Sequence, residues 1–220
     1  MPNSTNPKKY FLALHTSTPE LGLAISNFGG DSRCQVWNLE RNLSNLVHEY
    51  LIDFIKPQAW KDLGFIAVAK GPGGFTGTRI GVVIARTLGQ QLDIPIFGIS
   101  NLGAIALHHH KLNNKTGNLT ENQVYALEMP AQRGQIFGGI YSVSQNNLVT
   151  NIMPDTVMSP NQWQQAQINH NQNHQLIECK SGLAASVTSV LQLAYNEWLL
   201  LKHPHWSEVL PFYGQHPVDV

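Results

Sequence analysis

Four glycines and a proline stand between two apolar segments in the first half of the chain. The apolar run Phe65–Ala69 before them predicts a buried strand, and the Ala-rich segment after them, to about Leu92, predicts a helix. A strand, a glycine loop and a helix N-terminus in this order can bind an anion, because the first N–H groups of a helix lack partners within it. The loop residues concerned are Gly71, Pro72, Gly73, Gly74, Phe75, Thr76 and Gly77.

The common phosphate-binding motifs do not fit this loop. A dinucleotide fingerprint starting at Gly71 needs a glycine where Thr76 stands, and a P-loop needs a lysine after its glycines. Two interpretations stay open. In one, the loop is a tight strand-to-helix connection with Thr76 or Thr78 capping the helix, which is the commoner use of loop glycines. In the other, exposed backbone N–H groups contact a ligand or a partner.

Histidines and cysteines give no recognisable metal or nucleophile pattern. His108, His109 and His110 point in different directions on a helix, so we expect a solvated helix end there. The remaining candidates are isolated or lie in irregular polar settings: His170, His174, His203, His205, Cys34 and Cys179. Neither a zinc-protease motif nor a nucleophile elbow is present. We therefore expect no catalytic residue, no metal ligand and no cofactor-binding residue.

Composition and charge limit the partners that the chain can bind unaided. The 220 residues include 14 Lys and Arg and 14 Asp and Glu, for a formal net charge of zero. This balance argues against a large basic face that grips phosphates, so we expect any tRNA contact to need the charge of a partner. We see no signal-peptide core and no run of roughly 18 apolar residues, and we expect a cytoplasmic protein.

Two expected helices carry more apolar surface than one core contact needs. The segment Leu43–Lys56, with Asn42 as its expected cap, is apolar over about 180° of its circumference, whereas a core-facing helix needs only about 100°. A deeply buried helix and a partner-binding face both explain the excess.

The helix Thr78–Leu92 is apolar or small around most of its surface. Gly81, Ala85 and Gly89 form a ridge without bulk, which predicts close approach by another helix or strand. Arg79 lies in the first turn, where the helix dipole disfavours a cation, so we expect an acceptor near it. We predict that the two helices form a partner contact through Leu43, Leu46, Val47, Tyr50, Leu51, Phe54, Arg79, Ile80, Val83, Arg86 and Thr87.

The expected elements occur in the same order in both halves of the chain. Each half has three strands, a helix, a strand and a helix, and the first half adds one further strand and helix before its end. We predict two lobes over residues 1–112 and 124–220.

The segment Gly71–Gly81 resembles the signature of the TsaB family, also called YeaZ, whose usual form is GPGSFTGLRIG. Only Gly74 and Thr78 differ from that form. The family belongs to the actin/Hsp70/sugar-kinase superfamily. The resemblance therefore implies an α/β protein with duplicated RNase H-like lobes, the second of them degenerate.

The second half departs from the family pattern. Pro130, Gln132 and Gln135 stand where the family's second-lobe segment has Asp, Arg and Glu. The segment Pro211–Gly214 resembles the family's Pro-x-Tyr tail but lacks a nearby arginine. The resemblance is thus strong over Tyr10–Leu107 and thin after Glu128.

His15 stands where the family usually has Asp before Thr-Ser-Thr. Catalytic relatives use a carboxylate there to help hold metal and phosphate, whereas a neutral imidazole supplies no negative charge for a hard cation. The resemblance implies a non-catalytic subunit that binds TsaD, which transfers threonylcarbamoyl to the adenosine beside the tRNA anticodon. It also makes a TsaE-type ATPase and a second copy of the chain candidate partners, and it implies tRNA contact only through the complex and no membrane. The alternatives are a nucleotide-dependent kinase or ATPase of the same fold and a peptidase-like enzyme.

Overall fold

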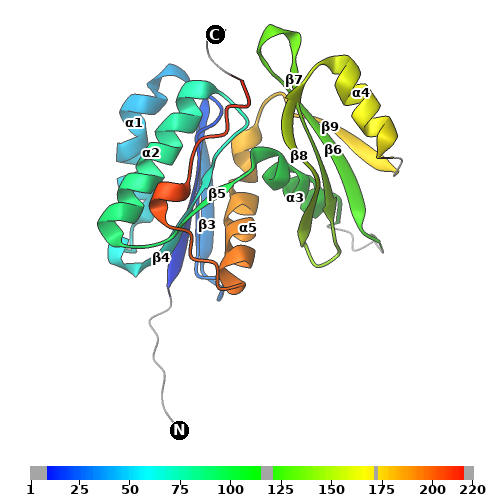
Figure 1. Ribbon diagram of the computed structural model, residues 1–220. Coiled ribbons are helices and arrows are strands. Elements are labelled where there is room, and N and C mark those ends of the chain that lie inside the picture. The colour runs from blue at the N-terminus through cyan, green and yellow to red at the C-terminus, as the bar shows by residue number, and fades with distance from the viewer. Residues whose placement is uncertain (1–8, 115–120, 171–172, 216–220) are drawn as a thin grey trace.

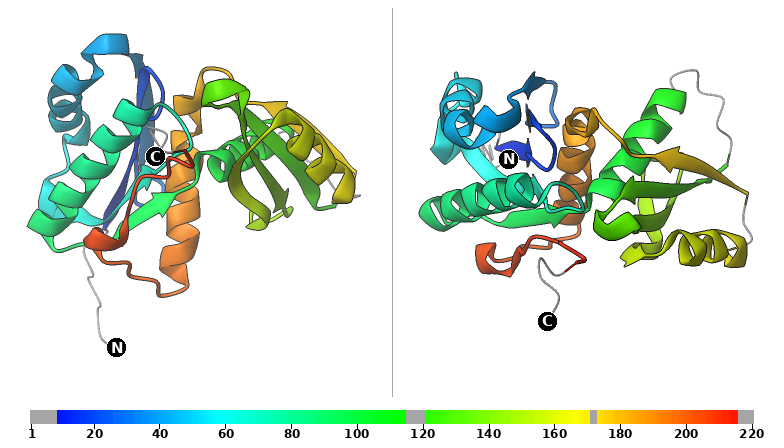
Figure 2. Two further views of the ribbon diagram at one scale, coloured as in Figure 1. Left: turned by 45° about the horizontal axis from the view of Figure 1, so that its top comes forward. Right: turned by 90° about the horizontal axis from the view of Figure 1, so that it is seen from above.

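The computed structural model describes residues 9–114, 121–170 and 173–215, which form two β-sheets with helices between and outside them (Figure 1, Figure 2). The first sheet has the order β3-β2-β1-β4-β5, and the second has the order β8-β7-β6-β9. The strands of the first sheet are β1 (Tyr10–His15), β2 (Glu20–Ser26), β3 (Ser32–Asn38), β4 (Leu63–Ala69) and β5 (Ile96–Ile99). Those of the second are β6 (Gln123–Pro130), β7 (Ile136–Val143), β8 (Val149–Met158) and β9 (His174–Glu178). The α-helices are α1 (Leu43–Ile55), α2 (Phe75–Leu92), α3 (Asn101–Asn113), α4 (Pro160–Asn169) and α5 (Val187–Leu199).

Both sheets are built in the same way. The first three strands of each pair antiparallel, and the strand after the next helix adds parallel to the first, as β4 does to β1 and β9 to β6. The first sheet extends this pattern by β5, parallel to β4. This is the element order that the sequence predicts.

The strands β1 and β4 in the middle of the first sheet are buried on both faces, and their alternating side chains enter two separate cores. Leu12 and Leu14 of β1 join the core beneath α1 and α2, whereas Phe11 and Ala13 join a second core beneath α5. The layers therefore run from α1 and α2 through the first sheet, α5 and α3, and the second sheet to α4 (Figure 1).

Each half of the chain contributes one helix that packs on the sheet of the other half. α3, from the first half, packs against β6, β7 and β8, and α5, from the second half, packs against β1, β2, β4 and β5. The predicted lobe boundaries at residues 112 and 124 stay a prediction, because each sheet is covered by a helix from the other segment.

The small-residue ridge of α2 is used inside the fold, as predicted. A Cβ at Gly81 would collide with the side chain of Thr16, and one at Gly89 with the side chain of Ile96. Ala85 between them is fully buried. The ridge lets α2 approach the first sheet closely and is not part of an exposed face.

The predicted cap position of Asn42 is confirmed, whereas capping of α2 by Thr76 or Thr78 is wrong. Asn42 makes no capping hydrogen bond, because a 3₁₀ turn over Glu40–Asn42 leads directly into α1. α2 begins after Gly74, so Thr76 and Thr78 lie within the helix, and Thr78 is buried.

In the described part of the chain, no helix has both the length and the apolar character that crossing a membrane requires.

Candidate functional site

The glycine loop before α2 packs against the turn that follows β1. The Gly74 N–H donates to the carbonyl oxygen of Ser17 over 2.7 Å, and the Thr16 hydroxyl donates to the Gly77 carbonyl over 2.8 Å. A Cβ at Gly77 would collide with the carbonyl oxygen of Thr16. Glycine is therefore required at Gly77 by close backbone approach.

A buried asparagine holds the start of the same loop. Asn101, at the first position of α3, donates from Nδ2 to the Pro72 carbonyl over 2.8 Å and accepts from the Gly71 N–H over 3.3 Å. Gly71 has a φ of 108°, a conformation that favours glycine. Of the two interpretations of the loop, the structure supports the tight connection, although not its capping by Thr76 or Thr78.

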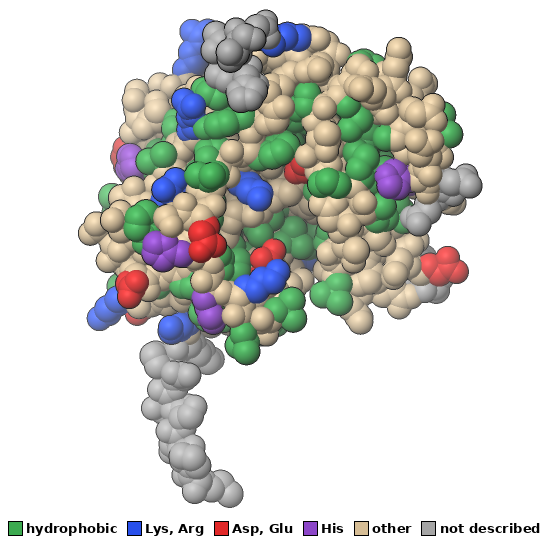
Figure 3. Space-filling model, viewed as in Figure 1, with side chains coloured by type: hydrophobic (Ala, Val, Ile, Leu, Met, Phe, Trp, Pro, Cys, Tyr) green, Lys and Arg blue, Asp and Glu red, His purple; other side chains and the backbone are tan. Residues whose placement is uncertain are grey.

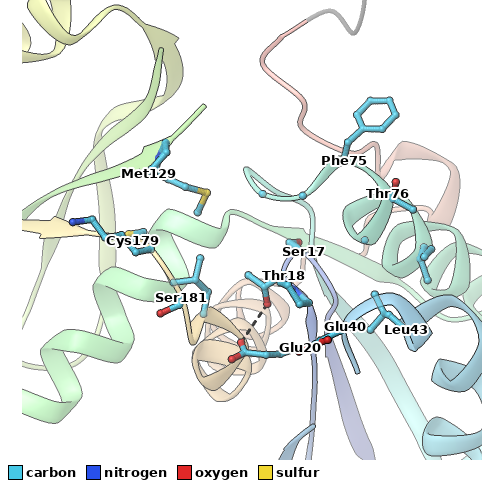
Figure 4. Close-up of a pocket in the computed structure, with 18 of the residues that line it drawn as sticks. Ser17, Thr18, Glu20, Glu40, Leu43, Phe75, Thr76, Met129, Cys179 and Ser181 are labelled. Atoms are coloured by element: carbon cyan, nitrogen blue, oxygen red, sulfur yellow. Dashed lines mark hydrogen bonds between the residues drawn. The ribbon is translucent and has the colours of Figure 1, made fainter. Parts of the chain in front are cut away.

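A wide cleft of about 1280 Å³ separates the two lobes at this loop. Figure 4 shows Ser17, Thr18 and Glu20 on one side of it and Met129 and Cys179 on the other. Its walls also include loop residues Gly73, Gly74 and Thr76. The cleft thus lies between the motif loop and the second sheet.

The charged side chains that line the cleft balance one another, with Arg41 and Lys180 against Glu20 and Glu40. Glu20 accepts hydrogen bonds from the Thr18 hydroxyl and the Ala184 N–H, each over 3.3 Å (Figure 4 shows the first). Lys180 pairs with the carboxylate of Glu178. With two wall carboxylates, Glu20 and Glu40, the lining offers little excess positive charge to a phosphate.

His15 does not line this cleft. Its side chain is fully buried at the end of β1, and neither ring nitrogen has a hydrogen-bond partner among the described residues. Burial lowers the pKa of His15 to about 4, so the ring is neutral near pH 7. The neutral imidazole expected from the sequence is thus also sequestered from any cleft ligand.

A buried polar cluster between the lobes was missed in the sequence. Asp155 accepts hydrogen bonds from Ser100 and Tyr141, each over 2.5 Å. Burial raises the pKa of Asp155, and the hydrogen bonds from Ser100 and Tyr141, with a smaller effect of the Lys70 ammonium, oppose that shift. The pairing of β7 with β8 is irregular here, so that Pro154 and Asp155 together face Gly139. This bulge turns Asp155 inward, and no local pattern in the sequence signals it.

The second surface feature is a groove of about 560 Å³ between α1 and α2. Its walls are mainly apolar and include Ile52 and Val83, whose side chains are 52% and 60% exposed. Trp60 and Leu88 add to the apolar lining, and Ser44 and His48 supply polar groups. Figure 3 shows hydrophobic and basic side chains interspersed over the lobe that carries α2.

The structure divides the predicted contact residues between the core and this groove. Four of them are buried and belong to the first core: Leu43, Val47, Leu51 and Phe54. Leu51 alone among these four also reaches the groove wall. The other three cannot contribute an exposed face, because the first sheet already uses them.

The remaining predicted contact residues are partly buried or line the groove, and Arg86 is partly buried outside the groove lining. Leu46, Tyr50 and Ile80 are partly buried and pack on the core. Arg79, Ile80, Val83 and Thr87 line the groove. Ile52 of α1, which is not among the predicted contact residues, also lines the groove.

The acceptor expected near Arg79 is a tyrosine from the far end of the chain. The Arg79 Nε donates to the Tyr213 hydroxyl over 2.6 Å, and its guanidinium carbon lies 4.0 Å from the ring centre of Phe75. Tyr213 belongs to the tail segment that resembles the family's Pro-x-Tyr. The main-chain N–H of its neighbour Phe212 donates to the Lys70 carbonyl over 2.7 Å and so holds the tail against the motif loop.

The histidine run near the end of α3 is only partly solvated, which corrects the expectation for His110. That ring is buried, with Nδ1 3.2 Å from the Tyr125 hydroxyl, and burial lowers its pKa. Among the residues that the structure describes, no group of three His, Cys, Asp or Glu side chains is placed to hold a metal ion.

Two sheets with this connectivity, each an antiparallel three-strand unit extended by a parallel strand, define the duplicated RNase H-like fold of the actin/Hsp70/sugar-kinase superfamily. The family model described as TsaD, tRNA N6-adenosine threonylcarbamoyltransferase, matches residues 38–199. The chain belongs to this family, and its curated relatives place it among the TsaB (YeaZ) proteins.

The relatives differ in how much of each chain they cover. The tRNA threonylcarbamoyladenosine biosynthesis protein TsaB of Bacillus subtilis is 33% identical over 156 residues, which are 69% of this chain and 63% of that protein. The Escherichia coli protein of the same name is 28% identical over 99 residues, or 45% of this chain and 40% of that one. The chain thus matches less than two thirds of the length of these relatives. YeaZ from Pseudomonas aeruginosa shares the fold, with a TM-score of 0.73 at 20% identity over 93% of this chain and 100% of that chain.

Proposed function

We propose that this protein is a non-catalytic subunit in the biosynthesis of threonylcarbamoyladenosine in tRNA. In this proposal it binds a TsaD-type transferase through the groove between α1 and α2 and supports threonylcarbamoyl transfer to the adenosine beside the anticodon. The pathway in this proposal is taken from the names of the curated relatives, and the TsaD-type partner is suggested by the family model that matches the chain.

The groove is the observation that carries the proposal. Ile52 of α1 and Val83 of α2 both line it and stay more than half exposed, although each is a large apolar side chain. Covering such surface gives roughly 25 cal/mol for each Å² of apolar area removed from water, which favours association. A partner helix that presents an apolar stripe fits between α1 and α2.

The cleft supports a non-catalytic role. The carboxylate that catalytic relatives use at the end of the first strand is replaced by His15, which is buried and neutral. In the glycine loop beside the cleft, the Gly74 N–H already donates to the Ser17 carbonyl, so this donor is not free for a ligand. In the proposal, tRNA is contacted only through the complex, because the chain carries no net charge.

The first test is complex formation in solution. The chain alone, the TsaD-type subunit of the same organism, and their mixture are measured by size exclusion with light scattering. We expect a new species at the summed mass, and a mixture of folded proteins that stays separate at micromolar concentrations would contradict the proposal. A TsaE-type ATPase is added in a further run, where co-elution with the pair identifies it as a second partner.

Val83→Asp tests the placement of the contact. A carboxylate at this exposed groove position should abolish pairing, because it would be buried without a counter-charge, at a cost of several kcal/mol. Thermal unfolding should change little, because the wild-type side chain is 60% exposed.

Ile168→Asp is the matched control for that variant. Ile168 is an exposed apolar residue on α4, at the opposite end of the layered structure (Figure 1). We expect it to pair like the wild type. Pairing by a folded Val83→Asp variant, or loss of pairing by Ile168→Asp, would show that the contact lies elsewhere.

A further inference from the structure

The α2 wall of the groove carries charge of one sign. α2 contains Arg79 and Arg86 and has no Asp or Glu along its length. Arg79 lines the groove, whereas Arg86 is half-buried with its guanidinium carbon 5.9 Å from the ring centre of Trp206. An apolar groove with a cation on its wall is complementary to an apolar helix that carries a carboxylate.

Arg79 is held in one orientation before any partner arrives. Its Nε donates to the Tyr213 hydroxyl, and its guanidinium carbon lies 4.0 Å from the ring centre of Phe75 and 5.2 Å from that of Tyr213. Tyr213 is itself fixed, because its ring centre lies 4.7 Å from that of Phe75. A long side chain that is already ordered loses less conformational entropy when it binds.

The arginine has no counter-charge within the described part of the chain. Ion pairs there join Lys56 to Asp53, Lys180 to Glu178 and Lys202 to Glu197, and none involves Arg79. Because α2 begins at Phe75, Arg79 is its fifth residue and lies in the second turn, not in the first turn that the sequence predicts, and no acidic residue stands in the first turn beside it. Because Nε is already engaged, the two terminal nitrogens are the donors left for an acceptor, and their planar geometry suits a carboxylate.

We propose that Arg79 is the specificity-determining residue of the groove and binds an Asp or Glu carboxylate on the partner helix. Tyr213 is its positioning residue. This inference rests on the proposed function, since it takes the TsaD-type subunit as the occupant of the groove. It adds the chemistry by which that occupant is recognised: a helix with an apolar stripe and one acidic side chain at its edge.

The binding experiment compares the dissociation constants of four proteins for the TsaD-type subunit, measured by calorimetry. Arg79→Gln should raise the dissociation constant roughly 30-fold, as expected when one member of a desolvated charge pair is removed. Tyr213→Phe keeps the ring but loses the hydroxyl acceptor, and should raise it by about 3- to 10-fold because Arg79 is no longer held. Arg86→Gln is the matched control, with the same charge change on the same helix outside the groove lining, and should stay within about 3-fold of the wild type.

The outcomes separate this inference from the proposed function. If the wild type does not bind at all, the proposed function fails. If the wild type binds and Arg79→Gln binds equally well, only the role of Arg79 is overturned. An equal loss in Arg79→Gln and Arg86→Gln would also overturn it, because it would show general electrostatic attraction.

A covalent experiment gives a second readout. Arg79→Lys keeps the positive charge and supplies a primary amine, and a water-soluble carbodiimide activates any carboxylate beside it. The amine attacks the activated carbonyl carbon, an amide forms, and the carboxylate oxygen leaves on the urea by-product. Mass spectrometry should find a link between position 79 and an Asp or Glu of the TsaD-type subunit, with no such link in the wild type. Links from other lysines but none from position 79, or a link to a second copy of this chain, would overturn the proposal.

Discussion

At the scale of single residues, His15 is the most unusual side chain of the molecule. It is fully buried, and both ring nitrogens lack a hydrogen-bond partner within the described structure. Folding therefore keeps the ring neutral, because a buried imidazolium would lose its hydration without gaining a counter-charge.

The stability of the protein should fall between pH 6.5 and 4 because of His15. The pKa of His15 is lowered to about 4 by burial, so in this range the unfolded chain binds a proton that the folded chain does not. The loss should reach about 3 kcal/mol near pH 4 and be absent above pH 7. Chemical unfolding at a series of pH values measures it.

His15→Leu should flatten that part of the pH profile, because the variant has no proton to gain on unfolding. His48→Leu, which changes an exposed histidine on α1, should keep the wild-type slope. Equal slopes in the wild type and His15→Leu would show that His15 does not cause the acid sensitivity.

At the scale of elements, the glycine loop acts as a joint between three parts of the fold. The turn after β1 packs on Gly77, Asn101 of α3 bonds to Pro72, and Phe212 of the tail closes on Gly71. The loop is thus fixed by residues far away along the chain. The glycines of this loop are required because neighbouring segments pack closely against them, which explains why the loop matches no phosphate-binding motif.

Gly77→Ala should destabilise the protein by about 2 kcal/mol or more, because the new methyl group meets the backbone carbonyl of Thr16. Gly74→Ser, which creates the residue most common in the family at that position, should change stability by less than about 1 kcal/mol. A Cβ at Gly74 lies 3.3 Å from the Ser17 carbonyl, and a serine there can cap α2. Thermal or urea unfolding compares the two, and similar losses would contradict the packing argument.

At the scale of the whole molecule, the exchange of helices makes the two lobes depend on each other. α5 supplies Val187, Val190, Leu191 and Ala194 to the core on the inner face of the first sheet. Burial of each large apolar side chain contributes about 1.5–3 kcal/mol, so together they are comparable with the 5–15 kcal/mol that keeps a typical domain folded.

A fragment of residues 1–100 should therefore fail to unfold cooperatively. Its first sheet lacks the helix that covers Phe11, Phe65 and Phe97, and it should bind a hydrophobic dye. The same fragment joined by a flexible linker to residues 183–215 should regain a cooperative transition in circular dichroism. Cooperative unfolding of residues 1–100 alone would show that the first lobe is independent of α5.

The positions of the helices and strands could be predicted from hydrophobic periodicity and turn residues, because both patterns are local. The start of α1 after Asn42 was predicted correctly, although Asn42 makes no side-chain capping hydrogen bond, whereas capping of α2 by Thr76 or Thr78 was wrong because α2 begins at Phe75. The predicted contact face of α1 included residues that are buried against the first sheet. A periodic apolar stripe looks the same in the sequence whether it packs on a sheet or on a partner.

The sequence by itself determined the element order, the fold class and the family, because periodicity and an eleven-residue motif, Gly71–Gly81, are written in adjacent residues. Only the tertiary structure decided which apolar residues stay at the surface, which helix covers which sheet, and that Tyr213 holds Arg79 across 134 positions of chain. It also brought Asp155, Tyr141 and Ser100 together. The physical reason is that these features arise from contacts between distant segments, and such contacts form only when the cores of both sheets close.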